Sequence, residues 1–301
     1  GDHRDLHSFP TRRSSDREAS GPLRTVLDCV PCFVRQAVEA LHCAGAAEAA
    51  RREVLRQVLR GLAAEVDLDS SPPEIAQRVH RLVRRLTGDG DPYAELKTRA
   101  NDIALAALPR LRGMVAAAPD GLAAAAGLAV AANALDAGVS LAAAAGGVSG
   151  GDEGGDAVDR LVEALRRGLD DPLCGDVDGF GEAVAQARTI LYLTDNAGEI
   201  VVDRLLVEAL PRERVVVAVR GAPVLNDATL ADARAAGLDE LVPVIENGSD
   251  APGTVLADCS PEFRRVFAAA DVVIAKGQGN YESLRSEEQT SEIQSPNTKS
   301  Y

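Results

Sequence analysis

The chain has 301 residues, 46% of them hydrophobic and 26% charged, a balance typical of globular proteins that excludes disorder as the dominant state. Its formal net charge of −14 repels a phosphate backbone, which argues against a nucleic-acid partner. No stretch reaches the roughly 20 apolar residues of a membrane helix, and five cysteines do not form an even disulfide framework, so we expect a soluble, cytoplasmic protein without a membrane partner.

The two ends of the chain differ from the rest. Residues 1–20 have neither a periodic apolar pattern nor the apolar middle of a signal peptide. The runs HSFPTRRSSD (7–16) and RSEEQTSEIQS (285–295) resemble translated sequencing-adapter DNA. We therefore expect residues 1–20 and 285–301 to be poorly packed, non-native tails. Truncation after residue 284 would then leave a strand at 271–275 near an open sheet edge.

The region from Pro22 to about Val148 has a helical pattern. Apolar residues recur at spacings of three and four in two runs, Leu27, Val30, Val34, Ala37, Val38, Leu41 and then Val54, Leu55, Val58, Leu59, Leu62. Prolines at 72–73 and at 92 open two further helices. A glycine-rich loop at 146–155 and an amphipathic helix at about 156–169 follow. Residues 21–170 are therefore predicted to form an all-helical domain.

From residue 189 onward, short β-branched runs alternate with helical segments. Strands are predicted at 189–194, 215–219, 241–245 and 271–275, with helices between them at about 199–209, 228–236 and 261–269. This alternation predicts an α/β fold, a three-layer α/β/α doubly wound sheet that is mostly parallel, with right-handed crossovers. It occupies residues 171–284, after the N-terminal helical domain.

Polar side chains follow each predicted strand. They are Asp195, Asn196 and Glu199 after the first, Arg220 and Asp227 after the second, Glu246, Asn247 and Asp250 after the third, and Lys276 and Asn280 after the fourth. Ligands of such sheets bind beyond the carboxyl ends of the strands. In any single loop these residues are equally well explained as helix caps, but four such loops on one rim favour a site.

The first two loops predict a metal site of oxygen donors. Asp195, Asn196 and Asp227 supply such donors, whereas the two histidines of residues 21–284, His42 and His80, lie in the helical half. Hard oxygen ligands suit Mg²⁺ or Mn²⁺, which use one or two carboxylates together with substrate phosphate oxygens, and other first-row ions stay open. Lys276 would add positive charge and donors for the phosphoryl oxygens.

Four segments resemble the metal-dependent damage-control phosphatase family, long called domain of unknown function 89, in its CxxC-bearing prokaryotic branch. They are DCVPCFVRQA (28–37), LTDNAGEIVVDRLLVEAL (193–210), VRGAPVLNDAT (219–229) and DVVIAKGQGNYESL (271–284). The resemblance implies an α/β/α domain beside a helical domain, a bound Mn²⁺ or Mg²⁺, and hydrolysis of small phosphate esters such as sugar phosphates. It also implies Asp195, Asn196 and Asp227 as metal ligands and Lys276 as the phosphate-contacting lysine.

The hypothesis of a metal-dependent phosphatase predicts Asp195 and Lys276 as the catalytic residues. The metal would polarise a phosphoryl oxygen and help position water, while the lysine neutralises developing charge. The resemblance places Asn133 and Asp136 of AANALDAG (131–138) at the same cleft. Together with Lys276 they are predicted to bind substrate, a small phosphorylated metabolite, along with residues of the strand-end loops, Glu199, Arg220 and Asn280.

Four questions stay open at the level of sequence. The same rim suits a module that captures a sugar phosphate without hydrolysing it, or a methyltransferase that uses S-adenosylmethionine, because fold does not decide function. The first loop offers metal ligands rather than a glycine-rich turn, which disfavours the methyltransferase. Cys29 and Cys32 form a CxxC pair at a helix start, for which packing and a metal or redox role are equally favoured. The physiological substrate and the oligomeric state are not determined.

Overall fold

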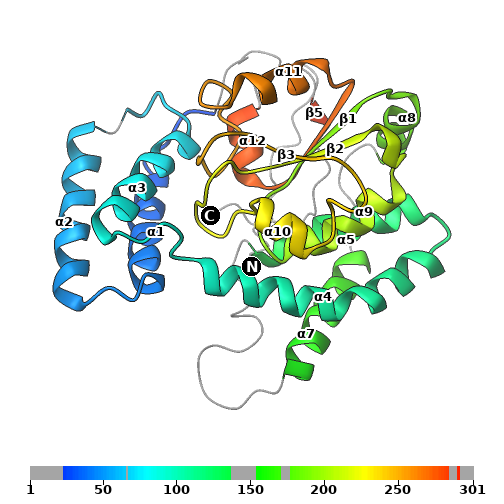
Figure 1. The fold of residues 1–301 in the computed structure, drawn as a ribbon, viewed down its shortest axis with the longest axis horizontal. Coiled ribbons are helices and arrows are strands. Elements are labelled where there is room, and N and C mark those ends of the chain that lie inside the picture. Colours follow the sequence, from blue (N-terminus) through cyan, green and yellow to red (C-terminus); the bar gives the residue numbers. More distant parts are fainter. Residues whose placement is uncertain (1–22, 66, 137–153, 171–176, 285–289, 292–301) are drawn as a thin grey trace, which may run out of the picture.

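The computed structural model describes residues 23–65, 67–136, 154–170, 177–284 and 290–291 (Figure 1). Its centre is a sheet of five strands in the order β3-β2-β1-β4-β5, in which every neighbouring pair is parallel. The strands are β1 (Ile190–Leu193), β2 (Val215–Val219), β3 (Val244–Glu246), β4 (Val272–Ala275) and β5 (Thr290–Ser291). All carboxyl ends of these strands therefore point to the same edge of the sheet.

Helices surround this sheet on both faces. In the first part of the chain they are α1 (Cys29–Cys43), α2 (Glu48–Glu65), α3 (Pro72–Thr87), α4 (Ala94–Ala117), α5 (Gly121–Asp136), α7 (Gly154–Asp170) and α8 (Val177–Gln186). In the second part they are α9 (Glu199–Ala209), a 3₁₀ turn (Arg212–Arg214), α10 (Leu230–Ala235), α11 (Pro261–Ala269) and α12 (Gln278–Leu284). The predicted α/β fold class, with helices on both sides of a parallel sheet and a helical region before it, is confirmed.

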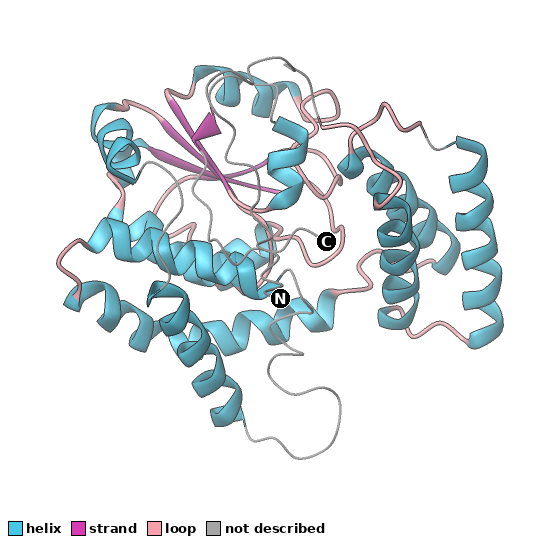
Figure 2. Cartoon of the chain, turned by 180° about the vertical axis from the view of Figure 1, so that it is seen from behind, coloured by secondary structure: helices cyan, strands magenta, loops and turns pink. Residues whose placement is uncertain are grey.

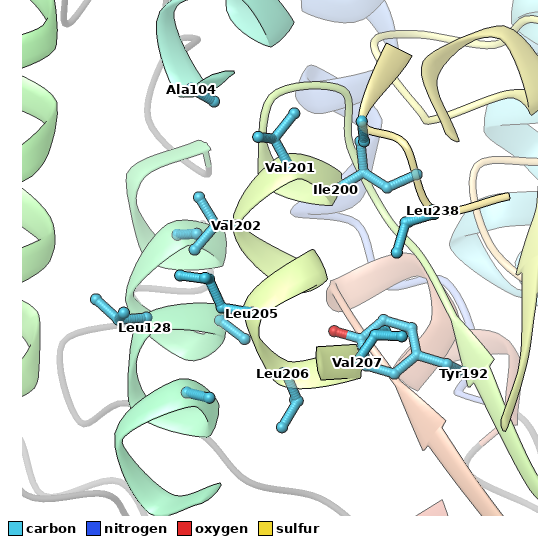
Figure 3. Close-up of a cluster of buried hydrophobic side chains, with 14 of the residues drawn as sticks. Ala104, Leu128, Tyr192, Ile200, Val201, Val202, Leu205, Leu206, Val207 and Leu238 are labelled. Carbon is cyan, nitrogen blue, oxygen red and sulfur yellow. The ribbon is translucent and has the colours of Figure 1, made fainter. Parts of the chain in front are cut away.

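The central strand β1 packs against helices on both of its faces. Successive side chains of a strand point to opposite sides, so Ile190 and Tyr192 join the core that contains α9, whereas Leu191 and Leu193 join the core of α11 and α12. Helix α9 lies between the sheet and α5, and Leu205 extends from it toward Leu128 of α5 (Figure 3). The central strand is thus buried on both faces, as its continuous apolar run predicts.

The first three helices form a separate core beside the α/β body (Figure 2). Helix α3 begins with a capping box made by Ser71 and Glu74 and ends at Gly88, which adopts a left-handed conformation. Helices α4, α5 and α7 instead share their core with α9 and the sheet. The helices of the predicted helical domain, residues 21–170, therefore divide between two cores.

Helix α3 is tied to the loop that follows β3. The Gln77 side chain donates hydrogen bonds of 2.7 Å to both Asp250 and Asp258, and Arg81 donates one of 2.8 Å to Asp250. Burial raises the pKa of Asp250, but the hydrogen bonds from Arg81 and Gln77 outweigh it and hold this pKa below the usual range. The helical bundle is thereby attached to one of the loops at the carboxyl edge of the sheet.

Some predicted boundaries were wrong. The third strand begins at Val244 rather than at residue 241, because Pro243 has no N–H to donate to the ladder. Helix α7 begins at Gly154, inside the predicted glycine-rich loop, whose residues 146–153 lie outside the described part of the chain.

The prediction of an open edge at the strand 271–275 was also wrong. Val273 pairs with Thr290 and Ile274 with Ser291, so β5 covers this part of β4. Strand pairing uses main-chain groups and needs no apolar side-chain pattern, so no pattern in the sequence predicted this pairing. Residues 1–20, 285–289 and 292–301 lie outside the described residues. In the part of the chain that is described, no helix is long and apolar enough to span a membrane.

Replacing Leu205 by Ala should lower the free energy of unfolding by about 2–5 kcal/mol, because this side chain is 2% exposed and its loss leaves a cavity between α9 and α5. Leu27→Ala is the matched control: Leu27 is 75% exposed, and its loss should change stability by no more than about 0.5 kcal/mol. Urea unfolding measures both values. Equal losses in the two variants would contradict the described packing of α9.

His80 of α3 should make stability depend on pH. Burial, with a smaller effect of the nearby Arg84 charge, lowers the pKa of His80 to about 3. Below about pH 6.5 the imidazole of His80 binds a proton in the unfolded chain but stays neutral in the folded chain. The free energy of unfolding therefore falls by up to ~1.4 kcal/mol per pH unit as the pH drops toward 3. His80→Gln should flatten the profile between pH 6.5 and 5, and urea unfolding at each pH measures this change.

Candidate functional site

Two loops meet at the carboxyl edge of the sheet, one after β1 and one after β2. Asn196 and Asp227 form an isolated antiparallel bridge between these loops. The Ala197 N–H donates to the carbonyl of Asn226 at 2.9 Å, and the Ala228 N–H donates to that of Asp195 at 2.7 Å. The pairing of β1 with β2 brings the loops side by side, and these main-chain bonds join them directly.

The bridge brings together the three predicted metal ligands, Asp195, Asn196 and Asp227. The Asn196 amide nitrogen donates to Asp195 Oδ2 at 2.9 Å. Asp227 is only 3% exposed, and burial raises the pKa of its carboxyl group even though the charge of Arg220 opposes this shift. Two carboxylates and a carboxamide thus lie within one small polar region.

Arg220 lies between the two loops. Its Nε donates to Asp227 Oδ2 at 2.6 Å, and its Nη2 lies 3.7 Å from Asp195 Oδ1. Its Nη1 donates to Asn280 Oδ1 at 3.0 Å, while the buried Nη2 makes no hydrogen bond to any described residue. The Asn280 amide nitrogen in turn donates to the carbonyls of Thr194 and Lys276, so Asn280 fixes the guanidinium in the site.

Lys276, which follows β4, reaches under the first loop to α9. It forms ion pairs with Glu199 and, at 3.0 Å, with Asp203, and both of these carboxylates are fully buried. Burial alone lowers the pKa of Lys276, but the charges of Asp203 and Glu199 outweigh burial and raise it above the usual value. Burial likewise raises the pKa of Asp203, against the charge of Lys276. The lysine is therefore held cationic.

The charge and donor chemistry of the site fit a divalent cation. The four carboxylates of the site are accompanied by two cationic side chains, Arg220 and Lys276. Among the described residues no group of three or more His, Cys, Asp or Glu side chains is arranged to hold a metal ion. The predicted set instead combines two carboxylates with an asparagine, the composition by which Mg²⁺ is held when substrate oxygens and water complete its shell.

Gly277 allows this arrangement by its lack of a side chain. Its φ is +83°, and a Cβ atom added there would lie 1.9 Å from Asp195 Oδ2. The chain after β4 can therefore pass directly against the Asp195 carboxylate only with glycine at this position.

For the other predicted substrate-binding residues, contact with substrate stays a prediction. Asn133 is partly buried on α5, and Asp136 ends that helix with a side chain outside the described residues, so their contact with substrate stays a prediction. Glu199 is fully buried beneath the site, and the polar atoms of Asn280 are hydrogen-bonded within the protein. In this structure Glu199 and Asn280 position Lys276 and Arg220, and their contact with substrate also stays a prediction.

Sequence reasoning missed four buried polar residues near the site, namely Lys97, Asn101, Asp203 and Asp232. Asp203 had a local signal, because it follows Glu199 by four residues on a helix and the three residues between them are apolar. The other three lie on α4 and α10, and nothing in the local pattern connects these two helices.

The cysteine pair lies at the start of α1. Cys29 packs against the core of the helical bundle, and Arg35 donates a 3.4 Å hydrogen bond to Cys32 Sγ. Every described cysteine is free of disulfide bonds.

Comparison with known proteins identifies the family. Residues 25–295 match the model of the damage-control phosphatase ARMT1-like domain. The chain belongs to this family. An uncharacterized protein of Methanocaldococcus jannaschii is 35% identical over 266 residues, which cover 85% of this chain and 82% of that protein. A damage-control phosphatase of Archaeoglobus fulgidus is 35% identical over 215 residues, 70% of this chain and 69% of that protein.

A solved structure of the family has the same fold. It is a protein of Pyrococcus horikoshii from the family of domain of unknown function 89, with a TM-score of 0.76 at 30% identity, and the match covers 87% of each chain. A damage-control phosphatase of that organism is 29% identical to this chain over 266 residues, covering 87% of this chain and 86% of that protein. The resemblance drawn from sequence motifs is confirmed, and membership of the family supports phosphatase activity.

Gly277→Ala should displace the Asp195 carboxylate and destabilise the protein. Gly88→Ala is a matched control, because Gly88 has a similar φ of +74° but no atom within 4 Å of an added Cβ. The control should lose only the cost of a left-handed alanine, about 1–2 kcal/mol, and Gly277→Ala clearly more. Urea unfolding measures the difference, and equal losses would show that the contact between Gly277 and Asp195 is not tight.

Proposed function

We propose that the protein is a divalent-metal-dependent phosphatase that hydrolyses small phosphate esters such as sugar phosphates, with Mn²⁺ or Mg²⁺ as cofactor. The observation that supports this most directly is the bridge between Asn196 and Asp227, which gathers oxygen donors from two strand ends beside an arginine. Membership of the damage-control phosphatase family supplies the reaction class. The choice of sugar phosphates rests on the resemblance to that family.

Asp195, Asn196 and Asp227 would hold the metal ion, which supplies a Lewis acid for the phosphoryl oxygen and for water. Nη2 of Arg220, which makes no hydrogen bond to a described residue, lies beside Asp195. There it can donate a hydrogen bond to a phosphoryl oxygen once substrate is bound. Lys276 has three N–H donors, of which the carboxylates of Glu199 and Asp203 take two, and the third remains for the transferred group. Both side chains would oppose the charge that develops in the transition state.

We propose a cytoplasmic location, because the described cysteines are all free thiols, as in a reducing compartment. The proposed partner is a small phosphorylated metabolite. The net charge of −14 disfavours nucleic acid.

Replacing Asp195 by Ala should lower metal-dependent phosphate release by at least about 100-fold, because a ligand and its charge are removed from the reacting centre. Release from p-nitrophenyl phosphate, with Mn²⁺, with Mg²⁺ and with a chelator, measures the effect. Asp239→Ala is the control, since Asp239 is exposed in the same half of the chain. Unchanged turnover in Asp195→Ala would refute the assignment of this site.

The two alternatives predict other outcomes. A binding module would bind a sugar phosphate in calorimetry while releasing no phosphate, and a methyltransferase would bind S-adenosylmethionine. A panel of phosphate esters, assayed with the wild-type protein, would then identify the substrate class.

A further inference from the structure

Asn101 of α4 joins the two loops that carry the proposed metal ligands. Its Oδ1 accepts a 2.6 Å hydrogen bond from the N–H of Gly198, two residues after Asn196. Its Nδ2 donates a 2.9 Å hydrogen bond to Asp232 Oδ1. The Asn101 side chain is 4% exposed, so water does not replace either bond.

Asp232 extends this connection to the second loop. Its Oδ2 accepts hydrogen bonds from both the N–H and the hydroxyl of Thr229, at 2.8 and 2.7 Å. Thr229 is the N-cap residue of α10 and lies two residues after Asp227. Lys97, one turn before Asn101 on α4, lies 3.5 Å from Asp232 and 2.8 Å from Asp91. The ion pair with Lys97 offsets part of the cost of burying the Asp232 carboxylate, and the second pair, with Asp91, holds Lys97 beside it.

The carboxamide of Asn101 satisfies both loops because it carries an acceptor and a donor. The Gly198 N–H requires an acceptor, whereas the Asp232 carboxylate requires a donor. Gly198 also has φ +79° and ψ −52°, and no side chain of its own helix caps α9 at this point. The first ligand loop therefore depends on Asn101, which comes from a different helix.

We propose that Asn101 is a positioning residue that sets the spacing between the two ligand loops, and through it the affinity of the site for a divalent cation. This inference rests on the proposed function only for the identity of the ion. The dual hydrogen bonding itself belongs to the protein without metal. Residues that support metal ligands in this way typically change metal affinity by about 10- to 100-fold when replaced.

The test uses Mn²⁺ alone as the probe, measured by electron paramagnetic resonance on the metal-free protein. Asn101→Leu, which removes both bonds, should weaken Mn²⁺ binding by about 10- to 100-fold and accelerate amide exchange at Gly198 and Thr229. Asp102→Asn, at an exposed position of the same helix, should change neither quantity. Folded Asn101→Leu protein with wild-type Mn²⁺ affinity would overturn the proposal.

Asn101→Asp tests the two hydrogen bonds separately. It also provides the test if the leucine variant does not fold. It keeps an acceptor for Gly198 but sets a second carboxylate against Asp232, so exchange should rise at Thr229 more than at Gly198, with weaker Mn²⁺ binding. Wild-type behaviour of this variant in both measurements would overturn the positioning role.

Failure of the proposed metal site would look different, because the wild-type protein itself would then bind no Mn²⁺. In that case faster exchange at Gly198 and Thr229 in Asn101→Leu would still support the positioning of the loops. Unchanged exchange would overturn it.

Discussion

The burial of α9 between the sheet and α5 is the constraint on which the site depends. Helix α9 begins directly after the loop of Asp195 and Asn196, and it carries two fully buried carboxylates, Glu199 and Asp203. A buried carboxylate without a partner is strongly destabilising. Lys276 meets this requirement from the end of β4, and its ion pairs thereby tie the loops after β1 and β4 to the same helix.

In the loop after β2, a cationic side chain likewise pairs with a buried carboxylate. Arg220 pairs with Asp227 and approaches Asp195, and Asn280 holds the guanidinium from the helix that follows Lys276. Each cation of the site is thus shared between carboxylates, and burial still raises the pKa values of Asp203 and Asp227. A site with this excess of carboxylates would gain stability from a bound divalent cation, in agreement with the proposed chemistry.

The helical bundle takes part in ordering the loops at this edge of the sheet. Leu225, in the loop after β2, has a φ of +46° and packs against the core of α1, α2 and α3. This backbone conformation is unfavourable for leucine, so the burial of its side chain must offset the strain. Asp250, in the loop after β3, is held by Gln77 and Arg81 of α3. Two loops at the carboxyl edge therefore depend on contacts with a separate core.

Local sequence patterns predicted most secondary-structure elements and the edge of the sheet on which the site lies. Helices α9 and α11 and strand β2 have the predicted bounds, because apolar periodicity and proline or serine caps act within a few residues. The polar residues at the ends of β1, β2 and β4 were found because parallel strands end at one edge of the sheet. Only the tertiary structure revealed β5, whose pairing with β4 uses main-chain groups. Only the tertiary structure revealed the bonds of Asn101 to Gly198 and Asp232, since these partners are 97 and 131 residues away and a hydrogen bond between them depends on helix packing that no local pattern records.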